Sequence, residues 1–176
     1  GGEYLDPKRA VARGFEMIEE GATIIDVGGE STKPGAERVS MDEELTRIIP
    51  VIHELAKKGA LVSVDTMRAE VAALAVSAGA KIINDVSGGL ADPAMHATAA
   101  ALKTQYICMH WRGQSKDMDS LAKYEDVVRE VINELTKQVA AALLAGIEPT
   151  RLVIDPGFGF AKNADQNWEI LRNIDK

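Results

Sequence analysis

The sequence contains little cysteine, histidine or aromatic side chain. Of its 176 residues one is cysteine, three are histidine and 5% are aromatic. The single Cys108 cannot form an internal disulfide, and its place inside an apolar run predicts a buried packing residue. The histidines show no His-x-x-x-His spacing and there is no Cys-x-x-Cys pair, so an all-protein zinc site is not expected. The Gly-x-Ser-x-Gly motif of a hydrolase nucleophile is also absent.

Long hydrophobic runs are absent as well. No apolar run reaches the roughly 18 residues of a membrane span, and no charged and then apolar leader precedes the first predicted helix. We therefore expect a cytoplasmic protein without a membrane partner. The formal net charge of −7 argues against a nucleic-acid partner, which needs a clustered basic surface. Four cations close to predicted strand ends nevertheless suggest a locally cationic rim: Lys33, Arg68, Arg112 and Lys162.

Five short apolar runs rich in valine and isoleucine are present, and each ends in a polar side chain. The runs end at Asp26, Asp65, Asp85, His110 and Asp155. Segments with helical periodicity separate them, which is the pattern of repeated strand and helix units around a parallel sheet. Because the carboxyl ends of parallel strands meet at one edge, we expect these polar residues to gather at a single rim, where such folds do their chemistry.

The segments between the strands carry helix start and stop signals. An aspartate followed by proline, a Ser-x-x-Glu capping box and several terminal glycines mark their ends. The expected starts and stops, in chain order, are Asp6 and Gly21, Ser40 and Gly59, Thr66 and Gly79, Asp92 with no assigned stop, and Tyr124 and Gly146.

Two parallel architectures fit this order of elements. A doubly wound sheet normally has a glycine-rich phosphate loop after its first strand, and the run from Gly157 to Lys162 (GFGFAK) matches neither usual form. Polar residues at five successive strand ends favour a (β/α)8 barrel, which gathers ligand contacts from many strands. A closed barrel needs about 250 residues. We therefore expect residues 1–176 to be part of one barrel domain, with five of its strands visible and roughly three absent.

The polar residues of the rim indicate the kind of ligand. Acids and amides with scattered cations suit a flat, polar, nitrogen-rich molecule that also carries an anionic group. Asp65 could instead serve only to cap a helix. Asp85 is one position out of phase with Asn84, so its side chain is expected to face the helix layer. His110 either orients a loop or contacts the ligand.

Five motifs in order resemble the dihydropteroate synthase family. They are Asp26 to Ala36 (DVGGESTKPGA), Ser63 to Thr66 (SVDT), Ile83 to Asp85 (IND), Met109-His110 with Gly113, and Asp155 to Lys162 (DPGFGFAK). The resemblance runs along the whole chain. It implies a (β/α)8 barrel and a transferase that joins 6-hydroxymethyl-7,8-dihydropterin diphosphate to para-aminobenzoate, giving 7,8-dihydropteroate in folate synthesis.

The resemblance also assigns roles to residues. It implies that Asp65, Asn84 and Asp155 are the catalytic residues and hold the pterin ring. Three further residues are implied to contact the pterin: Asp26, Met109 and Phe160. The loop from Glu30 to Ala36 is implied to form the para-aminobenzoate site, with four contacts: Thr32, Lys33, Pro34 and Phe160. Magnesium is expected to bind the substrate diphosphate and a residue outside this chain. No residue of this chain is expected to be a metal ligand. A homodimer is the expected assembly.

Two positions depart from the family pattern. Lys33 stands where arginine is usual, and Trp111 follows Met109-His110 where methionine is usual. Because lysine lacks the two-pronged guanidinium, a bidentate contact with an oxyanion is weakened. A pterin-binding paralogue without turnover is therefore one alternative. A barrel that transfers methyl groups from methyltetrahydrofolate to a corrinoid is another. Family segments upstream and downstream are absent, so we expect this polypeptide alone to be inactive.

Overall fold

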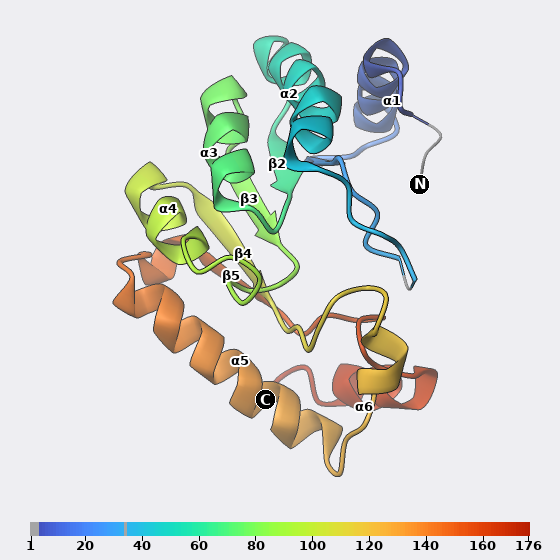
Figure 1. The fold of residues 1–176 in the computed structure, drawn as a ribbon, viewed down its shortest axis with the longest axis vertical. Helices are drawn as coiled ribbons and strands as arrows, with labels where there is room; N and C mark the ends of the chain where they lie inside the picture. The colour runs from blue at the N-terminus through green and yellow to red at the C-terminus, as the bar shows by residue number, and fades with distance from the viewer. Residues whose placement is uncertain (1–3, 34) are drawn as a thin grey trace.

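The computed structural model describes residues 4–33 and 35–176, which form one parallel sheet with helices between successive strands (Figure 1). The strand order is β1-β2-β3-β4-β5, and all four pairings are parallel. The strands are β1 Ile25–Gly28, β2 Val62–Asp65, β3 Ile82–Asp85, β4 Gln105–Met109 and β5 Leu152–Asp155. The α-helices are α1 Pro7–Glu19, α2 Met41–Lys57, α3 Ala69–Ala78, α4 Met95–Leu102, α5 Val127–Leu144 and α6 Ala164–Arg172. The two 3-10 helices are η1 Met118–Leu121 and η2 Pro149–Arg151.

The strand order distinguishes the two architectures. Each strand pairs with the next strand in the chain, and Figure 1 shows helices α1 to α5 in an arc on one side of the strands. A doubly wound sheet reverses its strand order and covers both faces with helices, so this arrangement is a section of barrel wall. The predicted α/β class and all five predicted strands are confirmed. The sheet is open in the described residues, with β1 and β5 at its edges.

The main core fills the space between the sheet and the arc of helices. Ile52 and Leu55 of α2 and Val62 and Val64 of β2 are fully buried in it. Gly14 of α1 lies so close to α2 that an added Cβ would approach Leu55 to 2.8 Å. Because side chains alternate along a strand, the residues between these core positions face the opposite side, which is the interior of the barrel wall.

The predicted helices are confirmed, with three corrected starts. Helix α5 begins at Val127, after its cap Asp126, and not at about Tyr124. Thr66 does not open a helix, because its hydroxyl donates to the buried carboxylate of Glu44 at 2.6 Å. Helix α3 begins at Ala69 instead, whose N–H donates to Asp92 at 2.8 Å. Asp92 therefore caps a neighbouring helix as well as its own turn, and α4 begins later, at Met95. Within the described residues, none of the helices combines the length and the apolar character needed to cross a bilayer.

Candidate functional site

The strand register places the predicted pterin residues on the interior face of the sheet. Asp65 at the end of β2 is paired with Asn84 on β3, and Met109 on β4 is paired with Asp155 on β5. Val64 and Ile83 point the other way, into the core. Alternation therefore turns Asp65, Asn84 and Asp155 to one face near the carboxyl ends of their strands. We call this edge of the sheet the rim.

Asp26 joins this group through a direct contact. The Asn84 side-chain amide donates to the Asp26 carboxylate at 3.0 Å, although the two residues lie on β3 and β1. The hydroxyl of Ser63, next to Asp26 in the register, is buried and has no hydrogen-bond partner among the described residues. Polar groups from three adjacent strands therefore meet on the interior face.

Asp65 lies in a poorly solvated and electronegative place. Burial is the main cause that raises the pKa of its carboxyl group to about 7, and the charges of Asp26 and Glu44 raise it further. None of the described residues donates a hydrogen bond to this carboxylate. The neighbouring Gly28 leaves it room, because a Cβ there would lie 3.3 Å from the carboxylate. Since Asp65 does not bond the first turn of α3, the structure gives no support to a purely capping role.

Asp155 is held by the turn that follows β5. Its carboxylate accepts a hydrogen bond from the N–H of Gly157 at 2.7 Å. Gly157 has a φ of +69°, and a Cβ there would lie 2.7 Å from the carbonyl oxygen of His110. Glycine is required at this position for both reasons. One oxygen of Asp155 is thus positioned by the protein, and the side chain is only half-buried.

An apolar cluster lies beside the acids. Met67, Val86 and Met109 are buried together, and Phe160 packs against them. Each of the four comes from the end of a strand or from the segment that follows it, so the cluster belongs to the rim. Met109 and Phe160 were predicted, whereas Met67 and Val86 were not. Their sequence signal is that each stands one or two positions after a polar strand end.

The loop after β1 reaches across the rim to the segment after β4. The N–H of Gly35 donates to the carbonyl of Ser115 at 2.9 Å, and the Ser115 hydroxyl donates to the carbonyl of Thr32 at 3.2 Å. Lys33 is exposed. The predicted contact of Pro34 lies outside the described residues.

An ion network fastens the other end of this loop. Glu30 accepts from Arg38 at 2.8 Å and from Arg68 at 3.1 Å. Arg68 also pairs with Glu44, whose side chain is 1% exposed and accepts from Thr66. The loop after β1 is thereby joined to α2 and to the segment after β2. Because these acids neutralise Arg68, this part of the rim is not the cationic surface that the sequence suggested.

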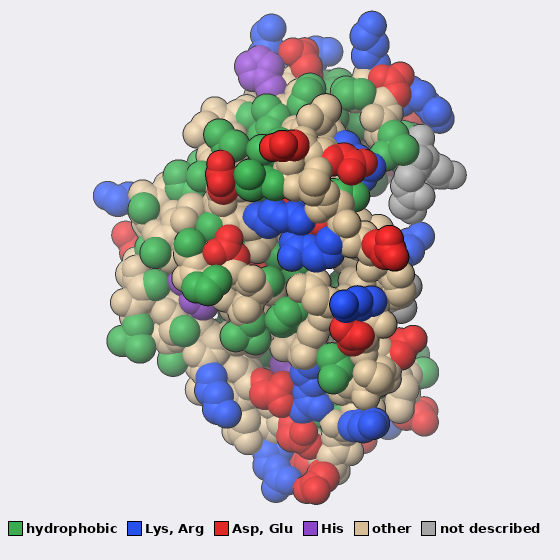
Figure 2. Space-filling view, viewed as in Figure 1, with side chains coloured by type: hydrophobic (Ala, Val, Ile, Leu, Met, Phe, Trp, Pro, Cys, Tyr) green, Lys and Arg blue, Asp and Glu red, His purple; other side chains and the backbone are tan. Residues whose placement is uncertain are grey.

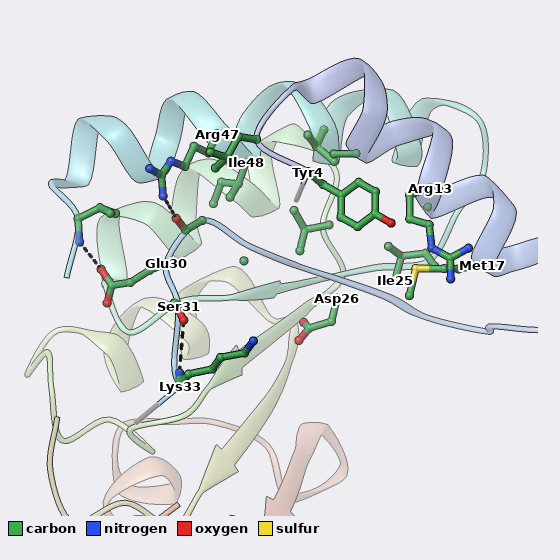
Figure 3. A pocket seen from close by; sticks show the side chains of 18 of the residues that line it. Tyr4, Arg13, Met17, Ile25, Asp26, Glu30, Ser31, Lys33, Arg47 and Ile48 are labelled. Atoms are coloured by element: carbon green, nitrogen blue, oxygen red, sulfur yellow. Dashed lines mark hydrogen bonds between the residues drawn. The ribbon is translucent and has the colours of Figure 1, made fainter. Parts of the chain in front are cut away.

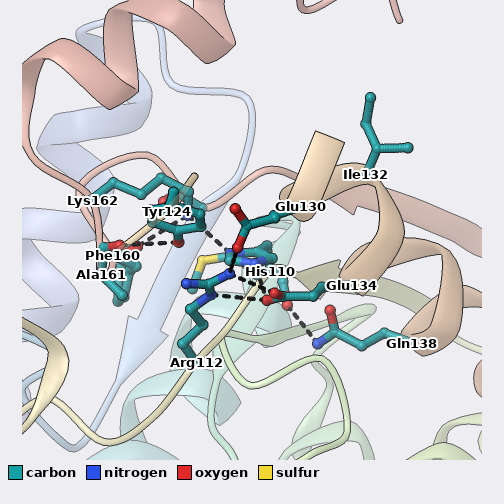
Figure 4. Close-up of polar contacts among 12 residues, drawn as sticks. His110, Arg112, Tyr124, Glu130, Ile132, Glu134, Gln138, Phe160, Ala161 and Lys162 are labelled. Atoms are coloured by element: carbon teal, nitrogen blue, oxygen red, sulfur yellow. Dashed lines mark hydrogen bonds and ion pairs between the residues drawn. The ribbon is translucent and has the colours of Figure 1, made fainter. Parts of the chain in front are cut away.

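A second network surrounds Arg112 (Figure 4). Arg112 pairs with Glu130 at 2.7 Å and Glu134 at 2.6 Å, and its guanidinium lies 3.7 Å from the ring centre of Tyr124. Burial opposes the charge of Glu134, but hydrogen bonds from Arg112 and His110 lower the pKa of its carboxyl group. Arg112 is thus the second of the four expected rim cations whose charge is neutralised by neighbouring acids. The space-filling view likewise shows acidic and basic side chains interspersed (Figure 2).

His110 and Lys162 lie next to this network. His110 is fully buried, with Glu134 at 2.8 Å from Nε2 and the Lys162 ammonium at 3.0 Å from Nδ1. Burial, followed by the Lys162 charge, lowers the pKa of His110 to about 4, so the ring is neutral at pH 7. Neutral Nδ1 then accepts from Lys162, and Nε2 donates to Glu134. Of the two alternatives for His110, the structure favours the orienting one.

Two further expectations are confirmed away from the rim. Asp85 faces the helix layer, fully buried, and accepts from the Tyr106 hydroxyl at 2.8 Å and from Ser87 and Gly89. Burial is the largest effect on its pKa, which is raised despite these hydrogen bonds. Cys108 is also buried, and burial raises the pKa of its thiol to about 12, so it is a packing residue and not a nucleophile.

A cavity of about 690 Å³ opens beside the rim between α1, α2, β1 and the following loop. Of the predicted site residues only Asp26 and Lys33 line it. Figure 3 shows the Lys33 side chain extending from the loop on the same side as the Asp26 carboxylate. The lining of the cavity does not include Asp65, Asn84 or Asp155.

The acidic side chains among the described residues are too dispersed to hold a metal ion. Within 4–33 and 35–176, no three histidine, cysteine, aspartate or glutamate side chains are grouped closely enough to hold one. Asp26 is instead paired with the side-chain amide of Asn84, and the other acids of the rim are separate carboxylates. The donor set present here does not form a cage for a bound cation.

Known proteins resemble this chain over its whole length. Residues 1–176 match the family described as "Pterin binding enzyme". The chain is 52% identical over 175 residues to dihydropteroate synthase of Mycobacterium leprae (strain TN), covering 99% of this chain and 62% of that protein. The solved structure of dihydropteroate synthase of Xanthomonas albilineans with 4-aminobenzoic acid matches with a TM-score of 0.90 and 43% identity. The match covers 99% of this chain and 62% of that chain.

The same Xanthomonas albilineans protein in complex with 7,8-dihydropteroate has a TM-score of 0.84 and 39% identity, covering 99% of this chain and 61% of that one. The chain thus spans about three fifths of the length of these relatives. The barrel fold and the family that the motifs indicated are confirmed by these matches. The chain belongs to the pterin binding enzyme family.

Proposed function

We propose that the protein containing this chain is a dihydropteroate synthase, a transferase that joins 6-hydroxymethyl-7,8-dihydropterin diphosphate to para-aminobenzoate. The observation that carries the proposal is the placement of Asp65, Asn84 and Asp155 on one interior face, with Asn84 bonded to Asp26. The similarity to the Xanthomonas albilineans dihydropteroate synthase, whose solved structures contain 4-aminobenzoic acid and 7,8-dihydropteroate, supports the same reaction.

The acids of the rim suit the donor edge of a pterin. An amino-pyrimidinone presents adjacent N–H groups, and a carboxylate accepts two such bonds side by side. Asp155 has the right geometry, because Gly157 fixes one oxygen while the side chain stays half-exposed. Asn84 offers both a donor and an acceptor. Each hydrogen bond to a charged partner contributes about 1.5–3 kcal/mol, so a ring without these donors is rejected.

The electrostatics also suit the reaction. In the proposed substitution the C–O bond to the diphosphate breaks with its electron pair on the leaving group, which leaves a pterin methylene cation. The aromatic amine then forms the C–N bond and releases a proton. Asp26, Asp65 and Asp155 place carboxylates close to the ring and stabilise this positive charge. Phe160, in the apolar cluster, supplies a flat wall for an aromatic ring.

Magnesium enters the proposal as a companion of the substrate diphosphate. The described residues do not form a cage for it, so no step of the reaction is assigned to the ion here. When bound, it would neutralise charge on the leaving diphosphate. Thr32 and Lys33 are proposed to contribute to the para-aminobenzoate site together with Phe160. A homodimer in the cytoplasm, with these small molecules as its partners, completes the proposal.

The test is a product assay with the full-length protein. Incubation with the pterin diphosphate, para-aminobenzoate and magnesium should give one 7,8-dihydropteroate for each diphosphate released. Diphosphate release without dihydropteroate would contradict the proposal. The variant Asp155→Asn, which loses the charge while keeping its shape, should lose most of the pterin affinity.

One alternative has an observation in its favour. Lys33 is an exposed point charge where the family usually has a planar guanidinium, so an oxyanion is held less firmly at this loop. A paralogue that binds pterin without turnover is therefore the second candidate. Calorimetry that shows pterin binding in a protein that forms no dihydropteroate would establish it. Restoration of turnover by Lys33→Arg would then identify the cause.

A further inference from the structure

Among the described residues, Lys162 is the only buried lysine or arginine, with 8% of its surface exposed. Its ammonium group lies 3.0 Å from three acceptors: Nδ1 of His110, the carbonyl oxygen of Gly157 and the carbonyl oxygen of Phe160. An ammonium group has three N–H donors, and here each has an acceptor. No carboxylate lies within ion-pair distance among the described residues. A cation placed this way organises the peptide around it.

The peptide that Lys162 organises is the one that carries two of the predicted pterin contacts. Gly157 accepts from Lys162 with its carbonyl and donates with its N–H to Asp155 at 2.7 Å. Phe160 accepts from Lys162 with its carbonyl, while its ring packs in the apolar cluster. Movement of the ammonium would therefore shift the carboxylate and the ring together. The turn also includes Ala161 at a φ of +48°, an uncommon conformation for alanine that needs such support.

His110 connects this arrangement to helix α5. The ring accepts from Lys162 on one nitrogen and donates to Glu134 on the other, and Figure 4 shows the three side chains in sequence. Glu134 is itself held by Arg112. The position of the ammonium is therefore set by α5 and by the segment after β4, not by the turn alone.

We propose that Lys162 is a positioning residue for the pterin subsite, which holds the Asp155 carboxylate and the Phe160 ring in binding geometry through the Gly157 and Phe160 carbonyls. This inference rests on the proposed function. It assigns a role to Lys162, the last residue of the DPGFGFAK motif. From the sequence, this residue was expected only to contribute positive charge to the rim.

The charges around Lys162 make the role dependent on pH. Burial lowers the pKa of its ammonium to about 8, against the opposing effect of Asp155 on β5. Arg112 lowers the pKa further and Glu134 of α5 raises it, while His110 is neutral in this range. Above about pH 8 the neutral amine has two donors for three acceptors, and Asp155 loses a nearby positive charge. Pterin affinity is therefore expected to fall as the pH rises through about 8.

The test uses the full-length protein and the variants Lys162→Met and Lys57→Met. Lys57, exposed in the last turn of α2, is the matched control. Lys162→Met is expected to raise the KM for the pterin diphosphate about tenfold or more, with a much smaller change in kcat. The reason is that the lost contacts hold the pterin equally well in the bound substrate and in the transition state. The alkaline fall in pterin affinity near pH 8 should disappear in Lys162→Met and persist in Lys57→Met.

His110→Leu is the second variant, in case Lys162→Met does not fold. It keeps the lysine but removes one acceptor, so the alkaline fall should move to lower pH. An unchanged alkaline limb in both His110→Leu and Lys162→Met, or a wild-type protein without such a limb, would overturn the positioning role alone. A wild-type protein that neither binds pterin nor forms dihydropteroate would instead overturn the proposed function, so the two failures are distinguishable.

Discussion

The side-chain amide of Asn84 donates to the carboxylate of Asp26 across the interior face of the sheet, at 3.0 Å, although 58 residues separate them. This contact orients the amide before a ligand arrives. It also leaves the Asn84 oxygen free to accept from a ring N–H. Preorganised groups lose less conformational entropy on binding, which increases affinity.

Asn84→Ala is expected to lower pterin affinity by about 2- to 12-fold, because a hydrogen bond between neutral groups contributes about 0.5–1.5 kcal/mol. Asp26→Ala should have a smaller effect on binding, since its carboxylate orients the amide and otherwise acts on the positive charge that develops during the reaction. The double variant should bind about as weakly as Asn84→Ala. Calorimetric titration of the full-length variants checks this, and additive losses would show that the two residues act independently.

Pterin binding should release protons from Asp65. In the free protein the pKa of this carboxyl group is about 7, so it is largely protonated at pH 6. Ring N–H donors favour the carboxylate form and lower its pKa in the complex. Binding should therefore release up to about one proton from Asp65 near pH 6, and this release should fade above about pH 8, where the Lys162 role instead predicts proton uptake on binding. Titrations in buffers of different ionisation enthalpy measure this number, and Asp65→Asn should abolish the release. Proton uptake near pH 6 would refute the assignment.

Arg68→Met should destabilise the fold strongly. It leaves Glu44, which is 1% exposed, without its cationic partner, and it leaves Glu30 paired with Arg38 alone. Removal of one partner of a buried pair costs about 3–5 kcal/mol. Arg129→Met, which breaks an exposed pair on α5, is the control and should change stability little. Denaturant unfolding compares the two, and equal effects would mean that the network around Glu44 is as weak as a surface pair.

Two glycines of the same turn separate backbone strain from a specific contact. Gly157 and Gly159 both have positive φ, +69° and +80°, but only a Cβ at Gly157 would meet its surroundings, at 2.7 Å from the His110 carbonyl. Alanine at either position should cost about 1–2 kcal/mol of stability from the backbone alone. Only Gly157→Ala should also lower pterin affinity, because it displaces the N–H that holds Asp155. Equal pterin affinities in Gly157→Ala and Gly159→Ala would contradict the role of the Gly157 N–H in holding Asp155.

The strands were predictable because they are encoded locally. Each run of valine and isoleucine ends in its own polar residue, and alternation from Asn84 to Asp85 was enough to place Asp85 in the helix layer, as the structure confirms. The convergence of Asp65, Asn84 and Asp155 followed from the same rule together with parallel pairing.

The remaining features depend on partners distant in sequence. The start of α3 was misplaced because its cap, Asp92, lies 23 residues away from Ala69. The cationic rim was wrong because Arg68 meets Glu30, 38 residues away, and Glu44. Lys162 resembles an exposed rim cation in the sequence, and only its contact with His110, 52 residues earlier, reveals that it is buried.

The most direct measurement is the affinity of a 6-hydroxymethyl-7,8-dihydropterin ligand for the full-length protein and for its Asn84→Ala/Asp155→Asn variant. Circular dichroism first verifies that both are folded. We predict that the wild-type protein binds the ligand and that the variant loses about thirtyfold or more in affinity, because one charge-assisted contact and one neutral hydrogen bond are removed. Equal binding by both proteins would show that the pterin does not occupy this face of the sheet.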